Sequence, residues 1–304
     1  MAEFRMLVGL PGCGKSTYSN NFKLEYNDYN IHSSDAIRAE FDIFGSDHNN
    51  EVFTILHKRV IDDLKNGKNV IYDATNLTRK SRRSILDKIK NIDCTKICVL
   101  FITPVEVCKE RNALRTGVAR VPDEVYDRML KSFNVPTLEE GFDHIQPEFL
   151  NASYKYKFNL PDMNIDQDNP YHTSTVQEHM NEAYELVKKE TNNLVILTAA
   201  KYHDIGKAYT KSFTDSKGNS TKYAHFYNHE NYGAYIYLIY WAYSDHMLEL
   251  KYWNALHVAQ LINWHMAPLN RWKQEKTVNK DRYYISDTLY NEILMLNRAD
   301  INAH

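Results

Sequence analysis

The segment at residues 9–17, GLPGCGKST, carries the clearest chemical pattern in the chain because it matches GxxxxGK[ST] in full. Glycines let backbone N–H groups curl around a phosphate, the lysine reaches the β- and γ-phosphates, and the following hydroxyl binds Mg²⁺. A short apolar run precedes the segment and a helical pattern follows it, which disfavours a chance glycine turn. We therefore expect ATP and Mg²⁺ here, with Ser16 on the metal and nucleotide contacts from Gly9, Gly12, Cys13, Gly14, Lys15, Ser16 and Thr17.

A carboxylate and an arginine, Asp35 and Arg38, follow the second expected strand. This strand end faces the γ-phosphate, where a general base for an acceptor hydroxyl must stand. Arg38 lies one helical turn later on the same face and can clamp an acceptor phosphate. The alternative is a helix-capping Asp followed by an exposed Arg. A further strand-end carboxylate, Asp73, suits Mg²⁺ water coordination or orientation of a catalytic arginine, or else caps a loop.

Two basic segments follow. Residues 79–90 hold six basic residues and one Asp. We expect a solvated helix face, with phosphate contacts as the alternative. Residues 109–122 set Arg111, Arg115 and Arg120 around a glycine before Pro122. This pattern suits a mobile lid that brings one of these arginines onto a transferring phosphoryl group, with surface arginines as the alternative.

The second half has its own signature, His203-Asp204-Ile-Gly-Lys207, at the end of an apolar helical pattern. An adjacent His and Asp can ligate one metal ion when a helix end points them into a bundle interior. Most isolated His-Asp pairs are incidental, but this one is accompanied at suitable positions by His179, His229, His265 and Asp300.

Two domains are expected to hold these residues: 1–150, a linker at 151–170, and 171–304. The first alternates apolar strand runs (3–8, 69–72 and 96–102) with helical patterns (51–65, 78–89 and 104–114), which predicts an α/β domain with a parallel sheet and flanking helices. The second shows helical patterns at 176–189, 194–203, 230–243, 250–265 and 287–299 and no comparable strand run, so we expect an all-α domain. The tyrosines at 232, 235, 237, 240 and 243 have helical spacing and are expected in its core, with base stacking as the second choice.

Composition narrows the class of protein. The 304 residues have a formal net charge of −2, 43% hydrophobic residues, 10 Gly and 8 Pro. These values exclude collagen-like and low-complexity chains, and no apolar run approaches the ~18–20 residues of a membrane-spanning helix. The four cysteines form no CxxC pair, so we expect reduced thiols and a cytoplasmic protein.

Residues 5–145 resemble the bacteriophage polynucleotide kinase and its P-loop relatives, through GLPGCGKST, SSDAIRAE, IYDATNLTRKSRR and ERNALRTGVARVPDEVYDRMLKSF. The resemblance implies that Lys15 and Ser16 bind ATP and Mg²⁺, that Asp35 activates a 5′-OH, and that Arg38 holds the neighbouring nucleotide phosphate. A lid arginine would stabilise the transition state. Arg115 matches its position best, but an extra residue before Val121 leaves Arg120 open.

Residues 171–304 resemble the HD phosphohydrolase superfamily, through the HDIGK segment and its His/Asp companions. The resemblance implies one metal site of His179, His203, Asp204 and Asp300, with His229 and His265 completing a second. Lys207 would neutralise phosphate charge. His and carboxylate ligands suit Mn²⁺, Fe, Co²⁺, Ni²⁺ or Zn²⁺ better than Mg²⁺ alone. His172 and His225 are expected to touch substrate, cap a helix or face solvent, and the remaining histidines of this half to be structural or exposed.

The pair of domains resembles the HD–polynucleotide kinase enzymes of nucleic-acid end healing, although in those relatives the HD domain comes first. The resemblance implies phosphorylation of 5′-OH ends and hydrolysis of 2′,3′-cyclic phosphate or 2′/3′-phosphate ends, on RNA or DNA, with a ligase acting downstream. Two alternatives remain open: a small-molecule nucleoside kinase fused to an HD nucleotidase, and an ATP-regulated HD hydrolase of a signalling nucleotide. The near-neutral charge mildly favours small substrates, whereas the basic segment and the arginine lid favour a strand.

Overall fold

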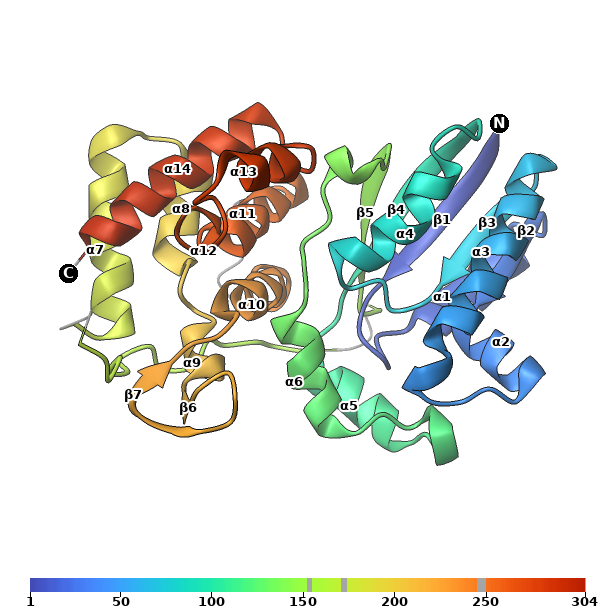
Figure 1. Cartoon of the computed structure of the whole chain (residues 1–304), viewed down its shortest axis with the longest axis horizontal. Helices are drawn as coiled ribbons and strands as arrows, with labels where there is room; N and C mark the ends of the chain where they lie inside the picture. Colours follow the sequence, from blue (N-terminus) through green and yellow to red (C-terminus); the bar gives the residue numbers. More distant parts are fainter. Residues whose placement is uncertain (152–154, 171–173, 245–249, 304) are drawn as a thin grey trace. The chain divides into compact units, whose positions relative to one another are not determined.

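The computed structural model describes residues 1–151, 155–170, 174–244 and 250–303, and these fall into two compact units (Figure 1). Unit 1 comprises Met1–Asp127 and Pro136–Asn151, and unit 2 comprises Arg128–Val135 and Ala152–His304. His172, His246 and His304 lie outside the described residues. In the ranges given, no helix combines the length and the apolar content needed to cross a bilayer.

Unit 1 is built on a sheet of five parallel strands in the order β2-β3-β1-β4-β5. The central strands β1 and β4 carry mostly buried apolar side chains, which explains their continuous apolar runs. Figure 1 shows α3 and α4 passing side by side across one face of the sheet. The chain order is β1 (Ala2–Val8), α1 (Lys15–Glu25), β2 (Tyr29–Ser33), α2 (Ser34–Phe41), η1 (Ser46–His48), α3 (Asn49–Lys65), β3 (Asn69–Asp73), α4 (Arg79–Ile89), β4 (Cys94–Ile102), α5 (Val105–Ala113), η2 (Gly117–Ala119), α6 (Asp123–Lys131), η3 (Leu138–Glu140) and β5 (His144–Phe149). The predicted α/β fold with a parallel sheet is confirmed, and β5 is a strand that the sequence analysis missed.

Arg82 on α4 corrects the expectation of a solvated basic face. Its side chain is fully buried and forms two hydrogen bonds of 2.6 Å to the carboxylate of Glu140 in η3. It also donates to the backbone carbonyls of Asn76 and Leu77 at 3.1 Å. A buried guanidinium is tolerated only when it is paired and hydrogen-bonded in this way, so Arg82 ties η3 to the loop after β3.

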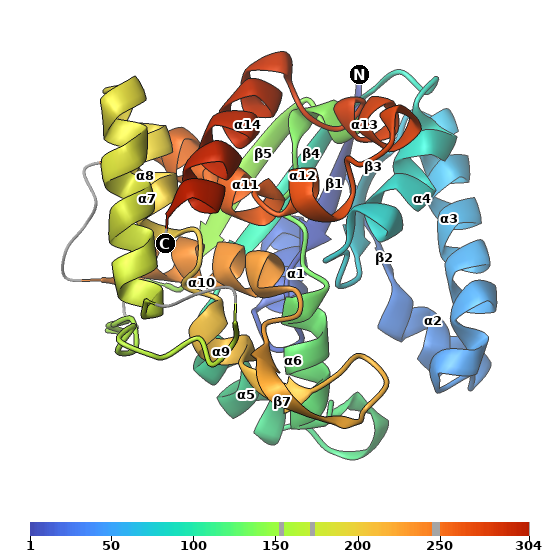
Figure 2. The ribbon, with the colours of Figure 1, turned by 60° about the vertical axis from the view of Figure 1, so that its left-hand side comes forward.

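Unit 2 is a bundle of helices. Helix α7 packs against α8 and α14, and α11 packs against α8, α10 and α14 (Figure 2). The elements are α7 (Val176–Glu190), α8 (Leu194–Tyr202), α9 (Lys207–Thr210), β6 (Ser212–Thr214), β7 (Ser220–His225), α10 (His229–Tyr243), α11 (Tyr252–Trp264), α12 (Ala267–Asn270), α13 (Glu275–Arg282) and α14 (Asp287–Asn302). The predicted helical domain is confirmed. Tyr232, Tyr235 and Tyr237 are buried in the core as expected. The antiparallel hairpin β6–β7 was not predicted.

Residues before α7 pack as part of unit 2. Phe158 is buried and its backbone N–H bonds to the carbonyl of Tyr243, while the N–H of Gln177 bonds to the carbonyl of Met163. The end of α7 nearest this segment is closed by a capping box, in which Thr175 and Glu178 exchange side-chain and backbone hydrogen bonds. The segment at 155–170 is therefore packed structure that leads into α7.

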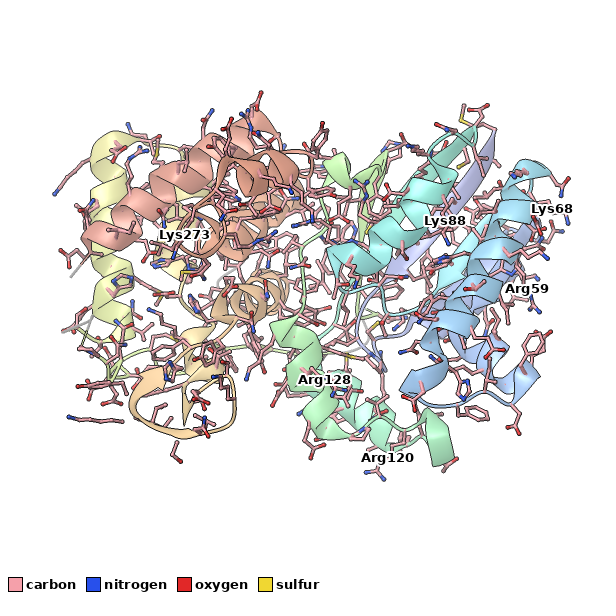
Figure 3. All side chains as sticks on the ribbon, viewed as in Figure 1. Arg59, Lys68, Lys88, Arg120, Arg128 and Lys273 are labelled. Carbon is pink, nitrogen blue, oxygen red and sulfur yellow. The ribbon has the colours of Figure 1, made fainter. Side chains whose placement is uncertain are left out.

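His57 on α3 joins the helical layer to the sheet in unit 1. Its Nε2 lies 3.0 Å from the hydroxyl of Tyr72 on β3, and its Nδ1 lies 3.1 Å from Nζ of Lys88, which Figure 3 labels on α4. Because the ammonium group of Lys88 can only donate, Nδ1 accepts and Nε2–H donates, which is the neutral imidazole. Burial, assisted by the charge of Lys88, lowers the pKa of His57 to about 4.

This pKa predicts a pH-dependent stability. The unfolded chain binds a proton at His57 below pH ~6.5 while the folded chain does not until pH ~4, so stability falls as the pH drops through that window. Between pH 7 and 5 the wild type should lose about 1–2 kcal/mol more than His57→Gln does in denaturant titrations. His48→Gln, at an exposed histidine, should behave as the wild type. Equal pH dependence of wild type and His57→Gln would contradict the neutral, buried imidazole.

Candidate active sites

The P-loop of unit 1 joins β1 to α1. Nζ of Lys15 is buried and donates to the carbonyls of Gly9 and Leu10 at 3.0 and 2.8 Å, so the ammonium group lies inside the loop. Gly14 precedes α1 with φ +111° and leaves the helix N-terminus open, with no side-chain cap. Free N–H groups at a helix N-terminus, beside a lysine, form an anion site of the kind that phosphates occupy.

Glycine at position 12 is required by a close backbone approach. Its φ is +80°, and a Cβ there would lie 2.3 Å from the carbonyl oxygen of Cys108 on α5. The same part of α5 is fastened to the loop by Tyr126, whose hydroxyl donates to the carbonyl of Pro11 at 3.0 Å. The loop is therefore pressed against α5, and any side chain at position 12 would push them apart.

Asp73 and Ser16 meet at the mouth of the P-loop. The hydroxyl of Ser16 donates to Asp73 Oδ2 at 3.2 Å, which is the arrangement needed to hold an Mg²⁺ ion and its water between them. Burial raises the pKa of Asp73, and the nearby charge of Lys15 opposes that rise. The charge of Asp35 raises the same pKa slightly further, and that of Arg115 lowers it. Both side chains therefore act electrostatically on the carboxylate of Asp73.

Asp35 lies in the first turn of α2, and Ser33 rather than Asp35 caps that helix. Ser33 pairs with Asp73 in the sheet, so the two strand ends that carry the carboxylates lie together. Asp35 is exposed. Arg38 is half-buried: its guanidinium donates to the carbonyl of Gly45 at 3.0 Å and to the side chain of Asn49. Arg38 therefore also fixes the turn between α2 and α3.

The expected lid runs from α5 to α6. Its base is closed by Asn112, which is buried and exchanges two hydrogen bonds with the backbone of Val121, of 2.7 and 3.0 Å. Arg115 is half-buried at the end of α5, whereas Arg120 is exposed in the segment that leads to α6 (Figure 3). The charge of Arg115 lowers the pKa of Asp73.

Arg111 lies closer to the P-loop than the sequence analysis expected. Its Nη1 is 3.5 Å from the carbonyl of Gly12 and would be 3.7 Å from a Cβ on Gly14. Arg111 is one α-helical turn after Cys108, whose carbonyl the loop approaches, so both residues lie on the face of α5 that meets the loop. Only the packing of α5 on the loop distinguishes it from the other two arginines.

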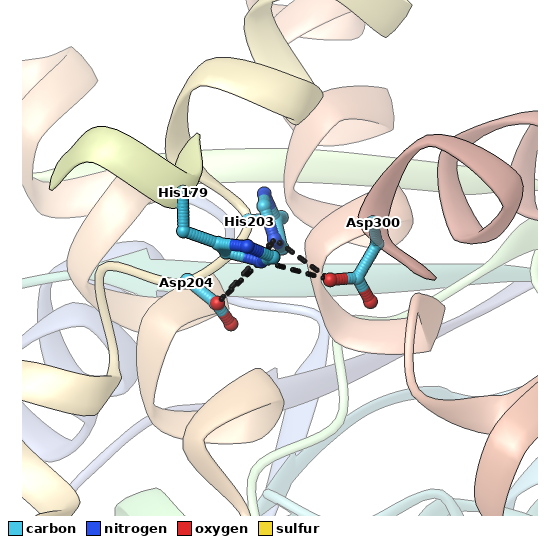
Figure 4. Close-up of side chains that lie close together, drawn as sticks. All are labelled: His179, His203, Asp204 and Asp300. Atoms are coloured by element: carbon cyan, nitrogen blue, oxygen red, sulfur yellow. Dashed lines mark hydrogen bonds and ion pairs between the residues drawn. The ribbon is translucent and has the colours of Figure 1, made fainter. Parts of the chain in front are cut away.

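The His/Asp residues of unit 2 converge on one buried cluster, although they come from α7, the end of α8, α10, the end of α11 and α14. Figure 4 shows His179, His203, Asp204 and Asp300 facing one another. The Nε2 atoms of His179 and His203 are 3.3 Å apart, and each lies 3.4 Å from Asp204 Oδ2. Asp300 Oδ1 lies 3.0 Å from His179 and 3.4 Å from His203.

A second group shares Asp204 with the first. The Nε2 atoms of His229 and His265 are 3.2 Å apart, and Asp204 Oδ1 lies 3.0 Å from one and 3.6 Å from the other. One carboxylate therefore offers Oδ2 to the first group and Oδ1 to the second. All six residues that the sequence analysis selected as ligands are brought together.

The backbone fixes which imidazole nitrogen faces the cluster. In each of the four histidines Nδ1 lies 2.7–3.2 Å from a backbone carbonyl oxygen, those of Ala303, Ala200, Phe226 and Ile262. A carbonyl only accepts, so Nδ1 carries the proton and the lone pairs of the four Nε2 atoms converge. Metal–ligand bonds of about 2.0–2.2 Å separate neighbouring ligand atoms by about 3.0–3.5 Å, which matches the spacing here. The residues fit a divalent metal ion in each group, and Asp204 would be a ligand in both.

Charge compensation inside the cluster is strong. Burial opposes ionisation of Asp204, yet Lys207 and His203 hold the pKa of this carboxyl well below its usual range. Burial disfavours the imidazolium of His203, but the carboxylates of Asp204 and Asp300 outweigh it and raise the pKa of His203 to about 10. The ionised carboxylates of the cluster are therefore stabilised by positive charge placed next to them.

Lys207 is buried beside Asp204. Its Nζ lies 2.6 Å from Asp204 Oδ2 and donates to Gln167 Oε1 at 2.7 Å. Gln167 is a site residue that the sequence analysis missed, because it lies in the irregular segment before α7 and no local pattern marks it. The structure thus assigns Lys207 a place at the edge of the cluster, held from the other side by Gln167.

Two glycines set the distance between the halves of the cluster. A Cβ on Gly206 would lie 2.0 Å from the carbonyl oxygen of His229 and 2.7 Å from the backbone nitrogen of Gly233. The turn that carries Asp204 and Lys207 therefore rests directly on the backbone of α10. Because both residues are glycine, His229 can reach Asp204.

Comparisons with known proteins find a different family match in each half of the chain. Residues 5–136 match the AAA domain family and residues 170–291 match the HD domain family. The L-seryl-tRNA(Sec) kinase of Methanococcus maripaludis is 26% identical over 53% of this chain and 58% of its own length. The bifunctional polynucleotide phosphatase/kinase of Schizosaccharomyces pombe is 24% identical over 47% of this chain and 33% of its own. The chain thus spans less than two thirds of either curated relative.

Solved structures to which parts of the chain are similar include a Pnkp1/Rnl/Hen1 RNA repair complex, with 24% identity and a TM-score of 0.38 over 42% of each chain. A fungal RNA kinase shows 15% identity and a TM-score of 0.36 over 50% of this chain and 76% of its own.

The shared carboxylate predicts the metal content of variants. Asp204→Ala should bind almost no transition metal, because it removes a ligand from both groups, whereas His265→Ala should retain about one ion of the two expected per chain. Elemental analysis of the purified full chain, after loading with Mn²⁺ and desalting, measures this. His257→Ala is the matched control, since His257 pairs with Glu292 in the same unit and lies outside both groups. Two ions per chain in His265→Ala would show that the second group is not a ligand set.

Proposed function

We propose, for a chain that joins a P-loop kinase domain to an HD domain, a bifunctional enzyme that heals nucleic-acid ends. The kinase domain would phosphorylate 5′-OH ends with ATP and Mg²⁺, and the HD domain would hydrolyse 2′,3′-cyclic phosphate or 2′/3′-phosphate ends with a transition metal. The observation that carries the proposal is the presence, in one chain, of a complete P-loop and of a His/Asp cluster in which Asp204 serves two ligand groups. The printed name of the fission-yeast relative, which joins polynucleotide phosphatase and kinase, supports the same pairing.

In the kinase domain the residues divide the work of phosphoryl transfer. Lys15 and the N-terminus of α1 hold the phosphates, and Ser16 with Asp73 holds Mg²⁺. Asp35, exposed beside the end of β2, accepts the proton of the attacking hydroxyl, and Arg38 holds the neighbouring phosphate of the acceptor. Arg111, which reaches the loop from α5, and Arg115, which follows that helix and whose charge acts on Asp73, stabilise the charge that develops on the transferring group.

In the HD domain, two metal ions would supply Lewis-acid activation of a phosphate ester and a water nucleophile of lowered pKa. The chain's own residues orient the metal ligands and the phosphate, and they exclude bulk water. The four carbonyls hold the imidazoles in one tautomer, Gln167 steadies Lys207, and Lys207 offers its ammonium group to the phosphate at the edge of the cluster. The buried position of the cluster keeps bulk water away from its walls.

The proposed substrates are RNA or DNA ends, and the products match what a ligase joins. Phosphorylating one end and removing the phosphate from the other leaves a 5′-phosphate and a free hydroxyl. We infer that a nucleic-acid ligase acts after this enzyme.

A single substitution in one domain should abolish the activity of that domain and leave the activity of the other domain unchanged. Asp35→Asn should lower 5′-phosphorylation of an oligonucleotide by about 10²–10⁴-fold while leaving end-phosphate hydrolysis unchanged. Asp204→Ala should do the reverse. The assay uses γ-labelled ATP with a 5′-OH oligonucleotide, and a 2′,3′-cyclic-phosphate-ended RNA with added Mn²⁺ or Ni²⁺. Asp42→Asn, at the exposed end of α2, is the matched control.

The same assays run with nucleosides, nucleoside monophosphates and cyclic mononucleotides test the small-molecule alternatives. Transfer to a free nucleoside that exceeds transfer to the oligonucleotide would replace the end-healing proposal with a nucleoside kinase fused to a nucleotidase.

Arg115 and Arg120 should differ in the kinase reaction. Arg115→Ala should lower kcat by about 10²–10³-fold with little change in the KM for ATP, because the contact is made with charge that develops during transfer. Arg120→Ala, the exposed neighbour, should stay within a few-fold of the wild type. The reverse ranking in steady-state kinetics would assign the transition-state contact to Arg120.

A further inference from the structure

The hairpin β6–β7 and the loop after it join the two sides of the His/Asp cluster. They occupy the segment between α9, which begins with Lys207, and α10, which begins with His229. The carbonyl of Phe226 accepts the Nδ1 proton of His229 at 2.8 Å, and Nζ of Lys207 lies 5.5 Å from the centre of the Phe226 ring. The end of the hairpin is therefore part of the wall that positions a metal ligand.

The two residues that flank Phe226 in the chain, His225 and Tyr227, are both aromatic. The rings of His225 and Tyr227 stack with centroids 5.1 Å apart and planes 9° from parallel. Tyr227 keeps 42% of its surface exposed although it is only two residues from the buried ligand His229. Asn228, between them, has φ +60°, the left-handed turn that separates an exposed ring from a buried one.

The hairpin is held firmly where it meets the cluster. The N–H of Ala224 donates to the carbonyl of Asp168 at 2.9 Å, and Lys211 pairs with the Asp168 carboxylate at 2.6 Å. The residue between Asp166 and Asp168 is Gln167, which binds Lys207. The aromatic stack and the edge of the cluster are thus fixed to the same short segment.

The charge around the stack suits a polyanion. Residues 211–228 contain three lysines and one acidic residue, Asp215. The Asp215 carboxylate is consumed in the turn, where it accepts from Asn219 and from the N–H of Lys217. Lys217 and Lys222 are exposed. Exposed aromatic rings among lysines are the usual means of binding single-stranded nucleic acid, because every base has a face that stacks.

We propose that the stacked pair His225–Tyr227 holds the terminal nucleobase of a nucleic-acid end whose phosphate reaches the His/Asp cluster. The HD site then selects base-bearing ends over base-free phosphate esters. This inference rests on the proposed hydrolase activity and adds its substrate class. The stack binds substrate and takes no part in the chemical step, so its loss should raise KM and leave kcat nearly unchanged.

The kinetic test compares two RNAs that end in a 2′,3′-cyclic phosphate, one with adenine on the last ribose and one with an abasic last ribose. For the adenine-ended RNA, Tyr227→Ala should raise KM about tenfold with kcat within twofold of the wild type. The KM for the abasic RNA should not change. Tyr227→Phe keeps the ring and should restore the wild-type KM. Tyr283→Ala, at an exposed tyrosine after α13, is the control.

A second readout needs no catalysis. An RNA that ends in 2-aminopurine, added to the metal-free full chain, should lose fluorescence when its last base stacks, and this loss should disappear in Tyr227→Ala but persist in Tyr227→Phe. The wild type could hydrolyse both RNAs with equal KM, and Tyr227→Ala could change neither KM nor the fluorescence. That result would contradict base binding by the stacked pair and leave the hydrolase proposal standing. If neither RNA is hydrolysed, the hydrolase proposal fails, and the fluorescence alone decides whether the rings bind a base.

Discussion

The carboxylate of Asp204 is buried among four imidazoles and an ammonium group, and the helical unit is arranged around it. A buried charge is very costly unless its neighbours compensate it, so each helix that approaches has to deliver either a cation or a ligand. Helices α7, α10 and α14 each contribute a ligand from within their length or from their first residue. Helices α8 and α11 end just before the histidines that reach the cluster. The backbone carbonyls then fix the direction of every lone pair.

The kinase unit depends on close backbone contact in a comparable way. Gly12 lets the phosphate loop rest on α5, and the helix brings Arg111 to the loop. Gly206 has the same role in the other unit, where it lets a turn rest on α10. Because each glycine has no side chain, the two elements that carry the ligands can pack directly against each other.

Local patterns in the sequence were sufficient for the parallel sheet and the helical second unit, because strand and helix periodicity is a local signal. The set of metal ligands came from the resemblance to the HD phosphohydrolases, and the structure brings its six residues together. Arg82 was wrongly expected in solvent, since its partner Glu140 is 58 residues away in the chain. Gln167 and Arg111 could not be singled out, because only tertiary packing brings them to Lys207 and Gly12. Hairpin β6–β7 was missed because its strands are short and polar.

The path of the chain through the two units determines where the polypeptide can be cut without separating residues that pack together. Residues 128–135 belong to unit 2, where Asn263 bonds to the backbone of Val135 and Phe133 and Asn231 bonds to that of Lys131. The chain then returns to unit 1 to supply Glu140 and β5. A cut at a single point near residue 150 therefore leaves the buried Phe133 on a different fragment from the rest of unit 2. It also removes the backbone partners of Asn231 and Asn263, which still bond to each other. Each unit is built from two separate stretches of the chain, so no single cut divides the polypeptide at a unit boundary.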